Sequence, residues 1–196
     1  MSYPKKLSAE AIVDAALAFI EAHGADALSM RTLAADLDVA PNALYRYFPS
    51  KTELTLALSD AAGRILLDEL QSATDGQDPL GALRATAHTY LRFARQRPAL
   101  YAIKMAHCKD SKDNKDGPDR DPAPSSHAEV WALVLSLTTA LPDRWSREDL
   151  AVALWAGLHG LVELDRTDML EGRDPAQALD VMLDVVLTGL AASLAA

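Results

Sequence analysis

Residues 29–51 read Ser-Met-Arg-Thr-Leu-Ala-Ala-Asp-Leu-Asp-Val-Ala-Pro-Asn-Ala-Leu-Tyr-Arg-Tyr-Phe-Pro-Ser-Lys, and this stretch predicts two short helices joined by a tight turn. In the first helix, Leu33, Ala34 and Leu37 recur at helical spacing and share one face. The repeat breaks after Leu37. Pro41 then suits the first turn of a second helix, because its missing N–H would have no partner there.

The second helix has an apolar face and an exposed face. Leu44 and Phe48 lie four residues apart and are predicted core, as are Leu33, Leu37 and Val39. The remaining faces carry Asn42, Ala43, Tyr45, Arg46 and Tyr47. This pattern is typical of a helix-turn-helix whose second helix enters the major groove of DNA.

An ordered series of residues extends this signal in both directions. An amphipathic helix with Ile12, Ala16 and Ile20 precedes Gly24, and the run Leu28-Ser29-Met30-Arg31-Thr32-Leu33-Ala34 follows. Val39, Leu44-Tyr45-Arg46-Tyr47-Phe48, Lys51 and Leu54 complete the series. From about Leu7 to Leu54 the chain resembles the TetR family of bacterial transcription regulators. The resemblance implies a helix-turn-helix DNA-binding domain, placed at residues 1–50, and a ligand-binding and dimerisation domain, placed at 51–196.

Composition favours an all-α protein. The chain has 196 residues, of which 49% are hydrophobic, and no strand-like alternation of any length occurs. No apolar run is long enough to span a bilayer, and the N-terminus lacks the apolar stretch of a signal peptide. The single cysteine, Cys108, excludes an intramolecular disulfide and fits a reducing compartment. We therefore expect a cytoplasmic protein.

Capping residues and periodicity predict about nine helices. Expected N-caps or capping boxes start at Ser8, Ser50, Asp78, Ser126 and Ser146. The expected ranges are about 8–23, 30–37, 41–48, 50–72, 79–97, 99–107, 126–140, 146–170 and 175–196. The polar stretch 109–127 is expected to be a solvated loop, and a metal-binding loop is the weaker alternative because lysines interrupt its aspartates.

The charge balance is unusual for a protein that binds nucleic acid. The net charge is −9, and residues 1–55 carry five bases against seven acids. All five bases, among them Lys5 and Lys6, lie on the N-terminal arm, the two short helices or the start of the next helix. Binding would depend on this local basic patch, and we expect modest non-specific affinity with a small salt dependence.

The predicted DNA contacts follow from this geometry and from the resemblance. Asn42 can make two hydrogen bonds to an adenine edge, and Ala43 can pack on a thymine methyl group. The full expected set is Ser29, Arg31, Pro41, Asn42, Ala43, Tyr45, Arg46, Tyr47 and Lys51. Alternatives stay open for three of these residues: Tyr45 as core, Arg46 as merely solvated and Lys51 as only a helix-start residue.

The remainder of the chain shows no catalytic constellation and no phosphate-binding glycine loop, so we expect neither an enzyme nor a cofactor. Trp155-Ala-Gly-Leu-His159-Gly160 is similar to a Trp…His-Gly pattern of one TetR subgroup. Trp155 and His159 share a helix face, with Glu163 one turn further. A metal site is weakly supported because no third ligand is evident. Packing and ligand contact both remain possible for His159.

The resemblance also implies a pocket for a small-molecule effector, whose binding would release DNA. The expected lining residues are Tyr90, Phe93, Tyr101, Met105, Trp131, Leu135, Trp155 and His159, and each also suits plain core. This mainly apolar set suggests a hydrophobic or aromatic effector, of unknown identity. A redox role for Cys108 is the weaker alternative.

The C-terminal helix predicts self-association. Leu183, Leu187, Leu190 and Leu194 form one stripe, with Gly189 and Ala191 beside it. A monomer of this size hardly needs so apolar a tail, so a two-fold four-helix bundle is a reasonable inference. The resemblance implies the same homodimer through the last two helices. A dimer would place two copies of the second helix of the helix-turn-helix, the reading helix, on a near-palindromic double-stranded operator.

Four hypotheses for function follow. The leading one is a repressor that a small effector releases from DNA, and the second is an activator or quorum-type regulator. The third, an all-helical ligand carrier or enzyme that has lost DNA binding, rests only on the net acidity. The fourth, a helical adaptor, leaves the run Tyr45-Arg46-Tyr47 unexplained.

Overall fold

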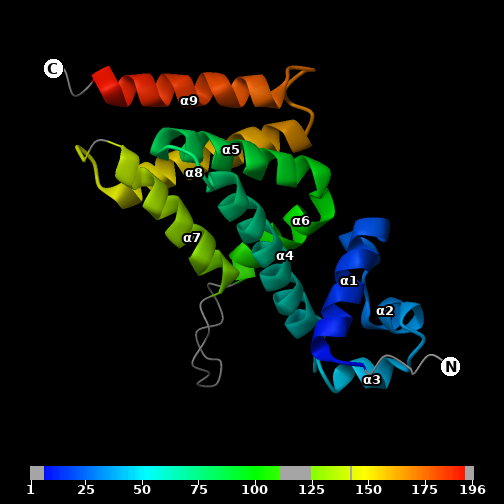
Figure 1. The fold of residues 1–196 in the computed structure, drawn as a ribbon. Coiled ribbons are helices and arrows are strands. Elements are labelled where there is room, and N and C mark those ends of the chain that lie inside the picture. The colour runs from blue at the N-terminus through cyan, green and yellow to red at the C-terminus, as the bar shows by residue number, and fades with distance from the viewer. Residues whose placement is uncertain (1–6, 111–124, 142, 193–196) are drawn as a thin grey trace. The chain divides into compact units, whose positions relative to one another are not determined.

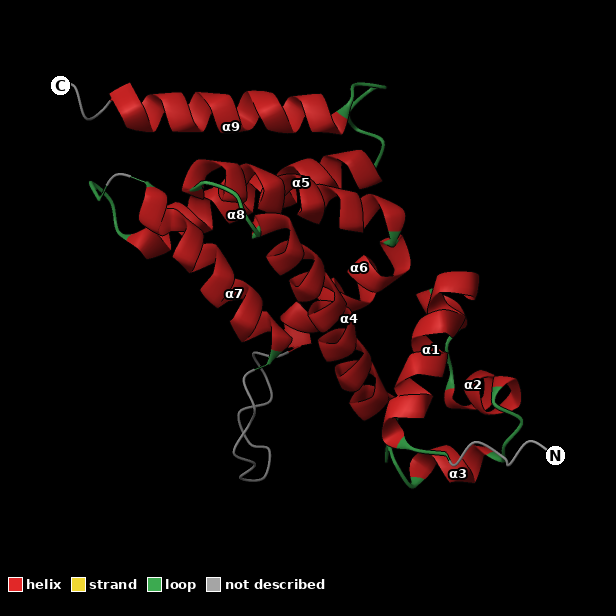
Figure 2. Ribbon diagram, in the orientation of Figure 1, coloured by secondary structure: helices red, strands yellow, loops and turns green. Residues whose placement is uncertain are grey.

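The computed structural model describes residues 7–110, 125–141 and 143–192, and the regular structure in these ranges is entirely helical (Figures 1 and 2). Nine α-helices account for most of it, with 3₁₀ turns at Ala25–Ala27 and Thr138–Ala140. They are α1 (Ala9–His23), α2 (Met30–Asp36), α3 (Pro41–Tyr45), α4 (Lys51–Thr74), α5 (Pro79–Gln96), α6 (Pro98–Asp110), α7 (Ser126–Leu137), α8 (Arg147–Arg166) and α9 (Pro175–Ala192). The predicted all-α class is confirmed.

The chain divides into two compact units. The head unit comprises Met1–Ile65 and Arg97–Ser126, and the body unit comprises Leu66–Gln96 and His127–Ala196. The head unit therefore holds α1 to α3, the first part of α4 and α6. This division follows contacts within the fold. The functional domains expected at 1–50 and 51–196 remain a prediction.

Local caps set several helix ends where the sequence predicts them. The Ser8 hydroxyl accepts a hydrogen bond from the amide of Ala11 at 3.1 Å, which caps α1. Gly24 ends the same helix at φ 83°, and its amide donates to the carbonyl of Ile20. In the first turn, the Glu10 amide and the Ser8 hydroxyl lower the pKa of the Glu10 carboxyl. Ser146 caps α8 in the same manner as Ser8 caps α1.

The core of the head unit is built from the apolar faces of its helices. Ile12 on α1, Leu33 on α2 and Leu44 on α3 are completely buried, and Phe48 is nearly so. Helix α1 also packs against α6. Leu37 and Val39, both predicted core, are only half-buried. These contacts hold α2 and α3 in a fixed relation, as a helix-turn-helix requires.

The turn between α2 and α3 uses one residue in the left-handed region. Asp38 has φ 53°, a conformation that aspartate tolerates better than most residues. Helix α3 ends at Tyr45, three residues before the predicted end at 48. The amides of Tyr47 and Phe48 both bond to the carbonyl of Leu44 at 2.9 Å. Pro49 follows, and a proline disfavours helical backbone in the residue before it.

Two other helix ends differ from the predictions. Helix α8 ends at Arg166 instead of near 170, because the chain turns through Asp168 at φ 56° and the Met169 amide bonds to Leu164. Ser126 is the first residue of α7 instead of its cap, and its amide donates to the Asp60 carboxylate at 2.8 Å. The Asp60 carboxylate on α4 therefore accepts a hydrogen bond from the first amide of α7, one of the amides at a helix start that have no partner within the helix.

Helix α5 is the centre of the body unit and packs against both α8 and α9 (Figure 1). Its inward side chains include Leu83, Ala87, Tyr90, Leu91 and Phe93, all buried. Two ion pairs, Arg84–Asp184 and Arg95–Asp165 at 3.2 Å, and a hydrogen bond between His88 and Asp180 at 2.8 Å join α5 to its neighbours. Exposed pairs add little stability, so apolar packing holds these helices together. None of the helices in the described ranges has the length and hydropathy needed to cross a bilayer.

Candidate DNA-binding surface and ligand cavity

The outer faces of α2 and α3 present the residues that the sequence predicts to contact DNA. Arg31, Asn42 and Arg46 are exposed, as are Pro41 and Lys51. Tyr45 and Tyr47 expose 46% and 37% of their surface, although aromatic side chains generally favour burial. Ala43 and Ser29 are half-buried. The alternative that Tyr45 is core is therefore not supported.

Ser29 has a structural task at the start of α2. Its hydroxyl accepts a hydrogen bond from the Thr32 amide at 3.0 Å, and the Thr32 hydroxyl accepts one from the Ser29 amide at 2.9 Å. This reciprocal pair is a capping box with threonine in place of the usual glutamate or glutamine. It fixes where α2 begins and so where Arg31 projects.

Tyr47 makes a contact that the sequence gives no means to predict. Its hydroxyl donates to the backbone carbonyl of Leu7 at 2.6 Å, across 40 residues of sequence. The tyrosine thereby connects the segment after α3 to the beginning of the described chain. Lys5 and Lys6, expected in the basic patch, lie outside the described residues.

The start of α4 has features that suit contact with a phosphate group. Lys51 is the first residue of α4 and is exposed. The Ser50 hydroxyl accepts from the Glu53 amide at 3.1 Å, as the predicted cap requires. The positive end of the helix dipole and the lysine charge lie together here, and both attract a phosphate group. The exposed acid Glu53 in the same turn weakens this attraction.

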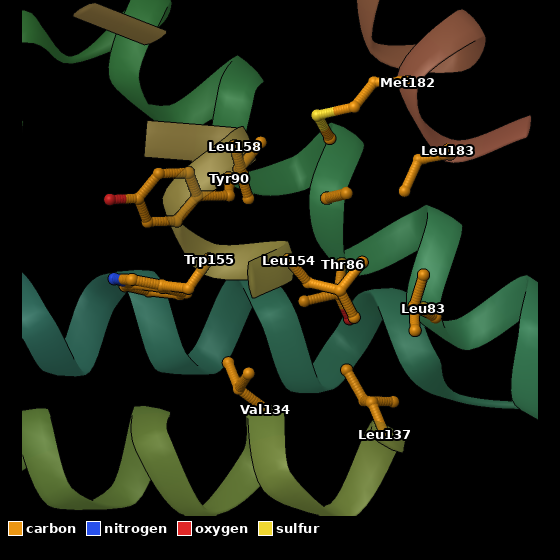
Figure 3. A pocket seen from close by; sticks show the side chains of 11 residues that line it. Leu83, Thr86, Tyr90, Val134, Leu137, Leu154, Trp155, Leu158, Met182 and Leu183 are labelled. Atoms are coloured by element: carbon orange, nitrogen blue, oxygen red, sulfur yellow. The ribbon is translucent and has the colours of Figure 1, made fainter. Parts of the chain in front are cut away.

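The body unit contains an apolar cavity of about 40 Å³ (Figure 3). Its lining comes from four helices, α5, α7, α8 and α9, and consists of Leu83, Thr86, Ala87, Tyr90, Val134, Leu137, Leu154, Trp155, Leu158, Met182 and Leu183. Apart from the Tyr90 phenol, no ionisable group lines the cavity within the described ranges. A charged ligand would lose its hydration there without compensation.

The aromatic rings of Tyr90, Trp155 and His159 pack against one another beside this cavity. The rings of Trp155 and His159 have centroids 4.7 Å apart, and Tyr90 lies 5.0 Å from Trp155. The Tyr90 hydroxyl shares a hydrogen bond with Nε2 of His159 at 3.0 Å. His159 therefore has a packing role and a polar partner, and neither excludes contact with a ligand.

The cavity contains only part of the predicted lining. Tyr90 and Trp155 line it, whereas Phe93, Trp131, Leu135 and His159 belong to the same unit but do not. The other two predicted residues, Tyr101 and Met105, lie on α6 in the head unit. Sequence reasoning missed Thr86, Leu154 and Met182, because helical periodicity does not show which inward side chains border a cavity. That the expected residues contact a ligand stays a prediction.

Further candidate sites are weaker. Within the described ranges, no cluster of three or more His, Cys, Asp or Glu side chains could hold a metal ion. Glu163, considered as a ligand beside His159, is exposed and pairs with Arg166 at 2.9 Å. Most of the 109–127 loop lies outside the described residues, as does the side chain of Cys108.

Helices α8 and α9 each expose apolar side chains. Val152 and Leu164 on α8 expose 56% and 41% of their surface, and Val181 and Val185 on α9 expose 58% and 67%. The predicted leucine stripe is placed differently. Leu183 is buried within the protomer and Leu187 is half-buried, while the Leu190 side chain and Leu194 lie outside the described residues.

Two family models match the chain. The model of bacterial regulatory proteins of the tetR family matches residues 12–58, which include α2, α3 and their turn. The model of the tetracyclin repressor-like C-terminal domain matches residues 83–186, more than half of the chain. Neither match bears on the Trp…His-Gly subgroup, which stays a prediction.

Curated relatives agree with these matches. An uncharacterized HTH-type transcriptional regulator of Mycobacterium tuberculosis is 25% identical over 193 residues, covering 98% of this chain and 82% of that protein. The HTH-type transcriptional repressor KstR of the same organism is 37% identical over 90 residues, covering 45% of this chain and 41% of the repressor. The matched segment therefore spans less than half the length of that repressor.

Solved structures share the fold. A protein of unknown function from Rhodococcus sp. RHA1 has a TM-score of 0.76 at 22% identity, covering 96% of this chain and 99% of that one. The regulator FadR of Bacillus halodurans, described as a fatty acid degradation regulator, has a TM-score of 0.68 at 16% identity, covering 93% and 97%. At these identities the likeness establishes architecture alone.

Proposed function

Because the chain belongs to the TetR family of bacterial regulatory proteins, it is a DNA-binding transcriptional regulator, and we propose that it is a repressor released from its operator by a small apolar effector. The observation that carries this proposal is the exposed face of α2 and α3. There, Arg31 on α2, Tyr45 at the end of α3, and Arg46 and Tyr47 directly after it face solvent, while the leucines within these two helices are buried. Exposed aromatic and basic side chains on a helix-turn-helix suit contact with a DNA duplex.

The contact residues divide into two classes. Asn42, Ala43 and Pro41 lie at the start of α3 and would meet base edges in the major groove. Arg46, Lys51 and Tyr45 would contact phosphates and fix the register of the helix on DNA. Arg31 on α2 could contact either a base edge or a phosphate.

The exposed face of α8 and α9 supports a homodimer. Four apolar side chains on two neighbouring helices face solvent, and a second copy of the chain would cover them in a four-helix bundle. An isologous contact of this kind gives two-fold symmetry. Two reading helices would then meet successive major grooves roughly 34–36 Å apart on a near-palindromic operator.

Effector release requires only differential affinity. A ligand that binds the arrangement incompatible with DNA more tightly than the compatible one shifts the population toward release. The apolar cavity in the body unit is the candidate site. Its lining favours an uncharged, mainly apolar molecule. With chromosomal DNA as its partner, the protein would act in the cytoplasm.

A binding experiment tests the proposal directly. The full chain is mixed with a fragment of its own promoter region and with random DNA of equal length, at low and moderate salt. We expect a gel-mobility shift that favours the promoter fragment. Equal binding to both fragments would contradict sequence-specific regulation. No binding to either fragment would favour the alternative of an all-helical carrier that has lost DNA binding, which the net charge of −9 suggests.

Selection of bound sites from a random DNA pool then tests the symmetry. We expect two inverted half-sites at a constant spacing, because a two-fold dimer presents two identical reading helices. Recovery of single, asymmetric sites would contradict the dimeric arrangement. Reporter transcription with and without the protein then separates a repressor from an activator.

A further inference from the structure

Thr86 is a buried polar residue without a partner. It lies on α5 with 6% of its surface exposed and lines the cavity of the body unit. Its hydroxyl oxygen has no hydrogen-bond partner within the described structure. Figure 3 shows the side chain among apolar neighbours that include Leu154 and Leu83. Buried hydroxyls are almost always satisfied in folded proteins, so this exception calls for a cause.

The other polar groups near Thr86 are already engaged. The hydroxyl of Tyr90, one turn further along α5, bonds to His159 at 3.0 Å. Thr89 is equally buried, but its hydroxyl accepts a hydrogen bond from Arg92 at 3.2 Å. Thr86 therefore offers the one unengaged side-chain hydroxyl among the described lining residues of the cavity.

Ordered water is a poor partner for this hydroxyl. A buried water molecule typically makes about three hydrogen bonds, and a cavity with one polar group cannot provide them. The remaining lining is aliphatic or aromatic apart from the Tyr90 phenol, whose hydroxyl already has a partner. A ligand that carries one polar atom on an apolar body satisfies the hydroxyl and fills the apolar space.

We infer that the effector is a small, uncharged, mainly apolar molecule with one hydrogen-bonding group, such as an alcohol or ketone, and that Thr86 binds this group. This inference rests on the proposed function, because it assigns the chemistry of the proposed effector site. Carboxylates and amines are excluded as charged species, since no oppositely charged group lines the cavity within the described ranges.

The size of the cavity sets a second condition. About 40 Å³ is far smaller than a typical ligand pocket, so the walls must move to admit a ligand. Met182 is suited to this movement because its unbranched side chain adapts to irregular space. It rests against Gly157, where an added Cβ would lie 2.8 Å from the methionine sulfur. Movement of the Met182 side chain away from Gly157 would enlarge the cavity at the point where α8 and α9 approach each other.

A matched pair of ligands tests the role of the hydroxyl. Benzyl alcohol and ethylbenzene have nearly the same size and shape, and only the alcohol can bond to Thr86. A second pair, 1-pentanol and n-hexane, has a different shape. Binding to the full chain is followed by the NMR signals of methyl-labelled methionines, because Met182 lines the cavity. Benzoate serves as the charged comparison and is expected not to bind.

We expect the protein variants to differ in how strongly they prefer the alcohol over the hydrocarbon of the same shape. The ratio of alcohol affinity to hydrocarbon affinity should fall about fivefold to tenfold in Thr86→Val, which keeps the side-chain shape and removes the hydroxyl. Thr86→Ser should keep the preference. Thr89→Val is the matched control, since it makes the same change at a buried threonine of α5 that does not line the cavity.

Several outcomes would overturn the inference. An unchanged ratio in Thr86→Val, an equal change in Thr89→Val, binding of benzoate as tight as that of benzyl alcohol, or no binding of either pair each contradicts it. DNA release is measured separately with the same ligands. If they bind in a Thr86-dependent manner and DNA stays bound, effector release by such ligands fails while this inference stands. If DNA is released equally from wild type and Thr86→Val, the inference fails while release stands.

Discussion

Tyr45 and Tyr47 lie two residues apart in the sequence and have different surroundings. Tyr45 is the last residue of α3 and exposes nearly half of its surface. Tyr47 directs its hydroxyl to the Leu7 carbonyl. The first is therefore available to DNA, whereas the second also holds Leu7, the first described residue, against the segment that follows α3. Side-chain type alone did not separate these two roles.

Alanine substitutions of the predicted DNA-contact residues should affect DNA binding in different ways. Arg46→Ala and Lys51→Ala should weaken binding to all sequences by similar amounts and reduce the salt slope by about one charge each. Asn42→Ala should change the preference at one base position by about 1–3 kcal/mol, because a bidentate base contact is lost. Fluorescence anisotropy with operator and shuffled DNA measures both effects.

The control for these variants is Arg64→Ala. Arg64 is an exposed arginine of α4 that pairs with Asp60 at 3.1 Å and is not among the predicted contacts. Arg64→Ala should leave DNA binding unchanged. This result would show that weaker binding in Arg46→Ala comes from a lost contact and not from the lower positive charge of the protein. Equal weakening in Arg64→Ala and Arg46→Ala would show that total charge, and not the contact surface, governs affinity.

At the scale of elements, local chemistry decides some helix ends and tertiary packing decides others. Ser8, Ser146 and Gly24 act on amides or carbonyls within four residues, so the sequence predicted these ends. The start of α7 depends on Asp60, which is 66 residues away. No local pattern could have indicated that partner.

The approach of α4 to the start of α7 gives a testable prediction. A Cβ added at Gly63 would lie 2.1 Å from the Ser126 hydroxyl and 2.8 Å from its Cβ. Gly63→Ala should therefore destabilise the protein by about 1–3 kcal/mol, despite the better helix propensity of alanine. Chemical denaturation, followed by circular dichroism, measures the change.

A second substitution tests the cause of that loss. Ser126→Gly removes the two nearest atoms that the new methyl group would meet and leaves only the end of the flexible Lys104 side chain at 3.2 Å, so it should restore most of the stability when combined with Gly63→Ala. A double variant as unstable as the sum of the two single variants would place the cause elsewhere.

At the scale of the whole molecule, the proposed function depends on assembly into a dimer. Val181→Glu and Val185→Glu each place a charge on the exposed face of α9 and should convert the dimer to a monomer. Operator affinity should then fall by about a hundredfold or more, because two linked reading helices no longer bind together. Analytical ultracentrifugation and a mobility-shift assay measure the two effects.

Leu80→Glu is the matched control for the dimer variants. Leu80 on α5 exposes 45% of its surface but is not part of the α8 and α9 face. It should leave the oligomeric state and operator affinity unchanged. A wild-type chain that sediments as a monomer at micromolar concentration would contradict the dimer.

The sequence by itself determined the helical class, the position of the helix-turn-helix and most helix starts. These properties depend on periodicity and on caps within a few residues, which are visible along the chain. Only the tertiary structure decided that Tyr47 reaches Leu7, that Leu183 packs inward and that Thr86 lines a cavity without a partner. The physical reason is distance: burial and pairing are set by residues far away in sequence, which become neighbours only when the helices pack.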